Sequence, residues 1–206
     1  MKREEKNALT QKRILQCAVR EFAGHGFEAA SMNVICRDSA VSKGNLYYYF
    51  ESKEALYLEC VRLCLSELTE SIRHDLAGEQ TEDLLDRYFD ARMRFFRKHP
   101  DLELLFCRSM VVPEGRMKEA VLAVRREFEA LNAEVIGKVL KGKKLRGTLT
   151  EEEVRELFRM LQGMWNSEGL LRPADTGEAE RRERICREMI GVFFYGVLER
   201  ESETKC

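Results

Sequence analysis

Apolar residues recur at the period of an α-helix through almost the whole of this 206-residue chain. In the first such stretch Leu15, Ala18, Val19 and Phe22 stand at positions i, i+3, i+4 and i+7, which places them on one face of a helix. The alternating patterns typical of strands are nearly absent, only three prolines occur, and the 13 glycines fall mostly at breaks. The sequence therefore predicts an all-α fold.

Three helices are predicted at the N-terminal end, joined by short breaks. The first ends at "GHG", residues 24–26, and Ser31 stands where it would cap a short second helix. Residues 40–42, "AVS", form a tight turn, and Ser42 caps a third helix that runs through Phe50. Two short helices joined by a three-residue turn and braced by a preceding amphipathic helix form a helix-turn-helix arrangement.

The rest of the chain is predicted to form a larger helical body. Ser52 caps a long fourth helix that ends near Leu76, and Thr150 with Glu153 makes a capping box at a later helix start. We expect about nine helices in all, the later ones over 81–98, 101–111, 114–140, 150–171 and 178–200, with the main breaks at Pro113, 141–147 and 172–177. The predicted domains are a helix-turn-helix DNA-binding domain over 1–51 and a helical effector-binding and dimerisation domain over 52–206.

Composition and charge narrow the class of protein. With 44% hydrophobic and 34% charged residues, the chain is expected to fold rather than stay disordered. No apolar run is long enough to cross a bilayer and the N-terminus has no signal-peptide core, so we expect a cytoplasmic protein without a membrane partner. Residues 1–50 carry eight Lys or Arg against five acids, although the whole chain has a net charge of −1, which hints at a polyanionic partner for that end.

The stretch "VSKGNLYYYFESKEAL", residues 41–56, holds three consecutive tyrosines, Tyr47 to Tyr49. Successive residues of a helix point about 100° apart, so the three rings cannot all face one core. If Leu46 and Phe50 face inward, the outward positions are Ser42, Lys43, Asn45 and Tyr48, joined by Tyr47 and Tyr49. Hydroxyls, an amide and an ammonium are groups that contact phosphates and base edges, which predicts a helix that enters the major groove of DNA.

Residues 27–56, "FEAASMNVICRDSAVSKGNLYYYFESKEAL", resemble the DNA-binding region of TetR/AcrR-type bacterial transcriptional regulators. The close resemblance covers about residues 10–58, and the remainder resembles the family only in the number and length of its helices. Ala40 departs from the pattern, because the family usually has glycine in the turn. If this position needs a positive φ, alanine costs on the order of 1 kcal/mol there.

The resemblance implies a set of DNA contacts. Asn45 is the expected base-specific contact, because an amide can pair with adenine through two hydrogen bonds. Lys53 would hold a phosphate at the N-terminus of the fourth helix. The complete expected set is Ser31, Asn33, Ser42, Lys43, Gly44, Asn45, Tyr47, Tyr48, Tyr49 and Lys53.

In the resembled family the C-terminal body forms a homodimer through its last two helices and encloses a pocket for a small-molecule effector. The resemblance thus implies a repressor that binds a palindromic operator on double-stranded DNA and is released by an effector that the sequence does not identify. Alternatively, the apolar stripes of the last helices pack only within one chain. The expected interface residues are Phe158, Leu161, Trp165, Ile190, Phe193, Phe194 and Val197.

Several apolar and polar side chains could line the effector pocket, although such stripes are more often plain core. Arg92 shares a face with apolar residues and needs an acceptor, either a carboxylate of the chain, which we favour, or a ligand carboxylate. The candidate lining residues are Tyr57, Cys60, Cys64, Tyr88, Arg92, Phe95, Phe96, Phe106, Met110 and Trp165.

Two alternatives belong to other classes of protein. Cys60 and Cys64 are one helical turn apart and could serve a metal- or redox-responsive DNA-binding sensor, with His99 or Cys107 as a third ligand. An enzyme is not expected, because no Gly-rich phosphate loop, HExxH or GxSxG motif is present. We expect neither a cofactor nor a resident metal.

Overall fold

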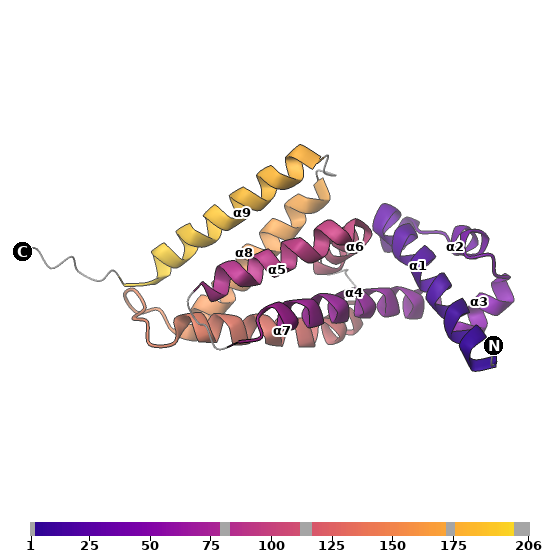
Figure 1. The fold of residues 1–206 in the computed structure, drawn as a ribbon, viewed down its shortest axis with the longest axis horizontal. Coiled ribbons are helices and arrows are strands. Elements are labelled where there is room, and N and C mark those ends of the chain that lie inside the picture. The colour runs from indigo at the N-terminus through magenta and orange to yellow at the C-terminus, as the bar shows by residue number, and fades with distance from the viewer. Residues whose placement is uncertain (1–2, 79–82, 112–116, 172–175, 200–206) are drawn as a thin grey trace, which may run out of the picture.

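The computed structural model describes residues 3–78, 83–111, 117–171 and 176–199. Within these ranges the fold is all-α and contains nine helices and no strand (Figure 1). The helices are α1 (Arg3–Ala29), α2 (Met32–Asp38), α3 (Lys43–Tyr49), α4 (Lys53–Asp75), α5 (Leu84–Lys98), α6 (Pro100–Met110), α7 (Met117–Leu140), α8 (Glu151–Leu171) and α9 (Thr176–Val197).

The molecule is elongated, with α1, α2 and α3 at one end and the remaining helices in a body beside them (Figure 1). Helix α4 runs from the N-terminal helices into the body, where it packs against α7. Helix α1 contacts both α4 and α6, so two helices of the body support the N-terminal end. Leu56, Val61 and Leu68 of α4 are fully buried, which makes α4 the central helix of the core.

Local cap signals set several helix boundaries, as the sequence predicts. The Ser42 hydroxyl accepts a hydrogen bond from the Asn45 backbone N–H at the start of α3, and Ser52 accepts one from Ala55 at the start of α4. Before α8, the Thr150 N–H donates to Glu153 Oε2 at 2.8 Å while the Glu153 N–H donates to Thr150 Oγ1 at 3.2 Å. The Thr150 N–H and the Thr150 hydroxyl both donate to Glu153 Oε2, and these two bonds lower the pKa of Glu153, as expected for a capping box.

The first helical segment ends at residues 24–26, as predicted, because Gly26 leaves the helical conformation with a φ of 74° and a ψ of 176° that glycine tolerates without strain. A second, short segment of α1 continues beyond this kink to Ala29. The start of α2 differs from the expectation. Ser31 occupies the N-cap position of α2, yet its side chain forms no capping hydrogen bond. Instead the Ser31 backbone N–H donates to Glu21 Oε1 at 2.8 Å, so a carboxylate of α1 holds the start of α2.

The turn between α2 and α3 has a Schellman geometry. The Ala40 N–H donates to the Arg37 carbonyl oxygen at 3.1 Å and the Val41 N–H to that of Cys36 at 3.0 Å. Ala40 has a φ of 51°, in the left-handed region where glycine is favoured. The φ of Ala40 is therefore positive, which was the condition for the expected energetic cost of alanine at this position. Alanine destabilises the turn accordingly.

The linker between α7 and α8 is fixed by backbone pairing. The Arg146 N–H donates to the Val197 carbonyl oxygen at 2.8 Å, and the Glu199 N–H donates to that of Lys144, also at 2.8 Å. The predicted break at Pro113 lies outside the described residues, as does most of the one at 172–177, of which 176–177 belong to α9. No helix in the described ranges is both long and apolar enough to cross a membrane.

Candidate nucleic-acid interface

Helix α3 presents a polar face to solvent. Leu46 is fully buried and Phe50 is 5% exposed, which fixes the rotation of the helix on the N-terminal core. Tyr48 is 72% exposed and Tyr47 is 40% exposed. The other exposed residues along this face, which we call the α3 face together with the two tyrosines, are Ser42, Lys43, Gly44 and Asn45.

Tyr49 lies differently from its two neighbours. It is half-buried, its hydroxyl donates to Asn7 Oδ1 in α1 at 3.1 Å, and its ring meets that of Tyr48 edge-on with centroids 5.2 Å apart. Tyr49 therefore ties α3 to α1 and supports Tyr48 from the side. The sequence placed all three tyrosines outward; the structure leaves Tyr47 and Tyr48 on the α3 face.

The remaining expected DNA contacts lie around the α3 face. Asn33 is exposed on α2, whereas Ser31 is half-buried. Lys53, the first residue of α4, donates from Nζ to the Glu28 carbonyl oxygen at 3.0 Å, and the same atom lies 5.1 Å from the centre of the Phe27 ring. Lys53 thus binds the C-terminal end of α1 in this structure. Its position in the sequence did not reveal this role.

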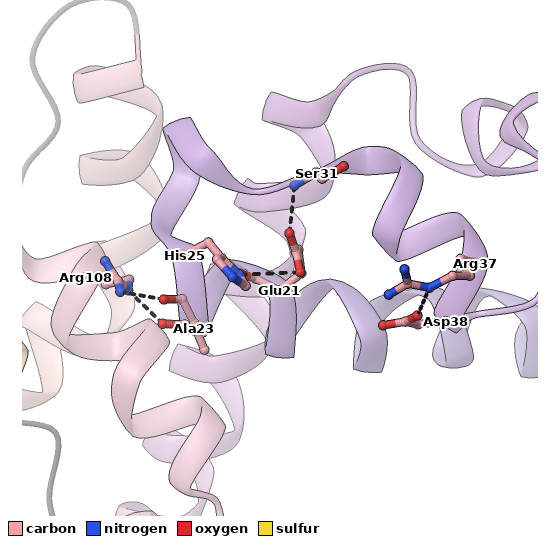
Figure 2. A network of polar contacts seen from close by, with 8 residues as sticks. Glu21, Ala23, His25, Ser31, Arg37, Asp38 and Arg108 are labelled. Carbon is pink, nitrogen blue, oxygen red and sulfur yellow. Dashed lines mark hydrogen bonds and ion pairs between the residues drawn. The ribbon is translucent and has the colours of Figure 1, made fainter.

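A polar network beneath α2 joins this end to the body of the molecule. Figure 2 shows Glu21 between the Ser31 backbone and His25, and Arg108 reaching α1 from α6. Glu21 is only 8% exposed, and its Oε2 lies 3.4 Å from His25 Nδ1. Arg108 donates to two carbonyl oxygens in the last turn before the kink, from Nε to Ala23 at 2.7 Å and from Nη2 to Gly24 at 3.0 Å. Neither Glu21 nor Arg108 stands out in the sequence, because each contacts a residue distant along the chain.

The body contains a cavity of about 700 Å³ between α7 and α8. Phe128, Phe158 and Met110 supply apolar walls, and Arg125 with Gln162 supplies polar groups. Of these residues the sequence predicted only Met110 as lining. The signal for the others was available: Arg125 lies four residues after the buried Val121 and three before the buried Phe128, so a charged group interrupts the apolar stripe of α7.

The other residues that the sequence predicted to line the effector pocket lie either at a second, small cavity or in the core. Arg92 and Trp165 border a small cavity of about 10 Å³ with Phe89. The Arg92 guanidinium carbon lies 4.8 Å from the centre of the Phe106 ring and 5.8 Å from that of Phe96, an aromatic contact that neither predicted alternative included. The remaining candidates are buried members of the core, namely Tyr57, Cys60, Cys64, Tyr88, Phe95, Phe96 and Phe106.

The expected interface residues of α8 and α9 lie mostly inside the chain. Phe158, Ile190, Phe194 and Val197 are at most 8% exposed, and Leu161, Trp165 and Phe193 are half-buried. These side chains pack against one another and against α5, as in the contact between Phe158 and Phe89. Among the side chains of the two helices that the structure describes, the large exposed apolar ones, which we call the α8–α9 surface, are Leu157, Met160, Met164, Ile185, Val192 and Tyr195.

The cysteine-based sensor alternative is not favoured. Cys60 and Cys64 are at most 1% exposed, and burial raises the pKa of both thiols, which keeps them protonated and unreactive. Cys64 donates to the Leu102 carbonyl oxygen at 3.3 Å. His99, one of the two proposed third ligands, is exposed, and the described part of the chain has no cluster of three or more His, Cys, Asp or Glu placed to hold a metal.

Comparison with known proteins agrees with this geometry. Residues 14–60, which span most of α1 and all of α2 and α3, match the family model of bacterial regulatory proteins of the tetR family. The chain therefore contains a segment of the TetR type over residues 14–60. Its TetR-type segment contains the turn at Ala40 and every expected DNA contact.

Relatives and solved structures extend the likeness along the chain. The HTH-type transcriptional regulator YerO of Bacillus subtilis is 30% identical over 126 residues, 59% of this chain and 43% of YerO. The regulator RutR of Escherichia coli K12 is 32% identical over 113 residues, 53% of this chain and 52% of RutR. The chain thus spans about half the length of the curated relatives it matches. FadR of Bacillus subtilis in complex with stearoyl-CoA has a similar fold, with a TM-score of 0.73 at 12% identity over 90% of this chain and 98% of FadR.

Proposed function

We propose that this chain is a DNA-binding transcriptional regulator of the TetR family that reads its operator through the α3 face. The observation that carries the proposal is the split of α3 into a buried side, with Leu46 and Phe50, and an outward side with Lys43, Asn45 and Tyr48. A lysine suits phosphate oxygens and an asparagine suits the edge of adenine, and the two stand two residues apart on one short helix. Residues 1–51 form the DNA-binding part of this proposal, and 52–206 the effector-binding and dimerisation part.

The proposed operator is a palindrome bound by a homodimer. The α8–α9 surface consists of six exposed large apolar side chains, three on each helix, and exposed apolar side chains that lie together mark association sites. A twofold interface would use this surface from both chains, which presents two α3 helices to two half-sites about one helical turn of DNA apart or a little more. The interface residues of the proposal are therefore the exposed set, with Leu161, Trp165 and Phe193 at its edge.

The proposed activity is repression that a small molecule relieves. The cavity between α7 and α8 has the volume of a ligand site and lies in the body of the chain. FadR, which has a similar fold, is known in complex with stearoyl-CoA. This complex supports a small-molecule site in the helical body of the present chain. An effector would release DNA only if it binds the DNA-free arrangement more tightly than the DNA-bound one.

Selection of bound sequences from random duplex DNA by the purified chain tests this proposal. We expect enrichment of a palindrome whose half-sites are separated by about one turn of DNA. Enrichment of single, non-palindromic sites would remove the dimer from the proposal. Recovery of an unenriched pool under reducing conditions, with or without added metal, would reject a sequence-specific regulator.

A further inference from the structure

Two residues that line the cavity between α7 and α8 each carry a buried hydrogen-bond donor without an acceptor in the described part of the chain. Among the described residues, neither Arg125 Nε nor Gln162 Nε2 has a hydrogen-bond partner. Both residues line the cavity, and Arg125 is only 8% exposed. Burying a donor without an acceptor is costly, so each such group in a native protein calls for an explanation. The two residues share one cavity, but these two atoms are shielded from solvent, so a bound acceptor would satisfy them once their side chains turn toward it.

The charges around the cavity argue against an ionic ligand. The lining contains three arginines, Arg125, Arg155 and Arg159, and four glutamates, Glu129, Glu152, Glu153 and Glu156. An anionic head group would have to compete with carboxylates that are already in place, and a cation would bring donors to groups that need acceptors. Each guanidinium already contacts a carboxylate: Arg125 with Glu129 at 2.9 Å, Arg155 with Glu151 at 3.0 Å, and Arg159 with Glu156 at 3.0 Å.

The remaining lining describes the rest of the ligand. Phe128, Phe158 and Met110 offer rings and a thioether to an apolar or aromatic body. Asn132 has little capacity to spare, because it accepts from the Tyr88 hydroxyl and donates to Gln162 Oε1 at 3.5 Å. A volume of about 700 Å³ suits a molecule of ordinary drug size.

We propose that this cavity binds an uncharged, largely apolar or aromatic molecule whose carbonyl-type oxygen accepts hydrogen bonds from Arg125 Nε and Gln162 Nε2. The inference rests on the proposed function in taking this cavity as the effector site. It adds the chemical class of the effector, and it excludes free carboxylates, phosphates and organic cations as its main ligands.

A fluorescence titration of the full chain, without DNA, tests the ligand class. The probes are prodan, an uncharged aromatic ketone, and anilinonaphthalene sulfonate, an anionic dye of comparable size. Prodan is expected to bind the wild-type chain more tightly than the sulfonate does. Absence of prodan binding, or tighter binding of the sulfonate that Arg125→Lys weakens, would overturn the proposal.

Three variants test the residues. Arg125→Lys keeps a cation beside Glu129 but has no Nε–H, and Gln162→Leu removes the amide at similar volume. At least one of them should weaken prodan binding by about three- to tenfold, the value of one hydrogen bond. Thr69→Val is the matched control, because its buried hydroxyl also lacks a partner but lies on α4 and does not line the cavity. Equal prodan affinity in all three variants would overturn the proposal, with circular dichroism melts confirming that each variant is folded.

The outcomes separate this inference from the proposed function. Prodan binding is read without DNA, so a chain that selects no operator can still satisfy the ligand test. Conversely, a chain that selects a palindrome but does not bind prodan keeps the regulator proposal and loses the ligand class.

Discussion

Arg108 Nε in α6 donates to the backbone carbonyl oxygen of Ala23 in α1 at 2.7 Å (Figure 2). Together with the bond to Gly24, this contact places a cation at the last regular turn of α1, where helix carbonyl oxygens favour positive charge. Glu21, two residues before Ala23, holds the start of α2 through Ser31. A movement of α6 would therefore reach α2 through one turn of α1.

Replacement of Arg108 tests this connection. Arg108→Met should lower the free energy of unfolding by about 1 to 2 kcal/mol, because two carbonyl oxygens lose a charged donor. It should also reduce the change in DNA affinity that an effector produces, since α6 would then move without α1. Urea unfolding and operator titrations with and without effector measure the two effects. Arg73→Met is the control, because the Arg73–Glu127 pair is exposed and worth less; equal effects in both variants would contradict the connection.

We expect the α3 face to divide into residues that support DNA affinity and residues that read the base sequence. Asn45→Ala should lower operator affinity by about 1–3 kcal/mol and relax the preference at one position of each half-site. Lys43→Ala should weaken binding to all duplexes and reduce the slope of log affinity against log salt by about one per half-site. Fluorescence anisotropy at several salt concentrations distinguishes the two patterns. Unchanged specificity in Asn45→Ala would assign base reading to another residue.

The turn at Ala40 carries a cost that one substitution removes. Ala40→Gly should raise the free energy of unfolding by about 1 kcal/mol, because glycine adopts a φ of 51° without the Cβ clash. Ala40→Val should lower it, since a β-branched side chain is less tolerant of this region. Chemical denaturation measures both variants. A less stable Ala40→Gly chain would show that unfolded-state entropy outweighs the strain.

The α8–α9 surface is expected to hold the dimer. Val192 is 70% exposed, so Val192→Asp should leave the fold of one chain intact while placing a charge in the interface. Sedimentation equilibrium should show a shift toward monomer, and affinity for the palindrome should fall. Val111→Asp, at a 47% exposed valine just after α6, is the control. A stable Val192→Asp dimer would place the interface elsewhere.

The buried cysteines should be chemically silent in the folded protein. Burial raises the pKa of Cys60 and Cys64, so neither forms an appreciable thiolate at neutral pH, and raising the pH within the range of the native fold should not release one. Timed alkylation with iodoacetamide, followed by peptide mass mapping, should modify the half-buried Cys36 before either of them. Rapid native labelling of Cys60 or Cys64 would revive the sensor alternative.

Features fixed by neighbouring residues could be predicted from the sequence. The caps at Ser42, Ser52 and Thr150 each involve a partner three residues away, so the amino-acid order is sufficient to place them. The buried side of α3 followed from the spacing of Leu46 and Phe50, which also left Tyr47 and Tyr48 outside.

Features that depend on contacts between distant residues could not be predicted in this way. Tyr49 turns inward because Asn7 of α1 accepts its hydroxyl, and Ser31 is held by Glu21 rather than by its own side chain. On α8, Leu157 and Phe158 stand 100° apart, and only packing against α5 shows which of them is covered. The residues that the sequence named on α8 and α9 therefore lie mostly on the buried side of these helices, and the interface itself stays a prediction.

The central claim is that two α3 faces read a palindrome. Its most direct test is a titration of the selected palindromic duplex, beside a duplex with one half-site scrambled, at two salt concentrations. We predict two chains per palindrome, a loss of at least about tenfold in affinity for the scrambled duplex, and a steep fall of both affinities with salt. Equal affinity for the two duplexes at both salt concentrations would contradict the claim.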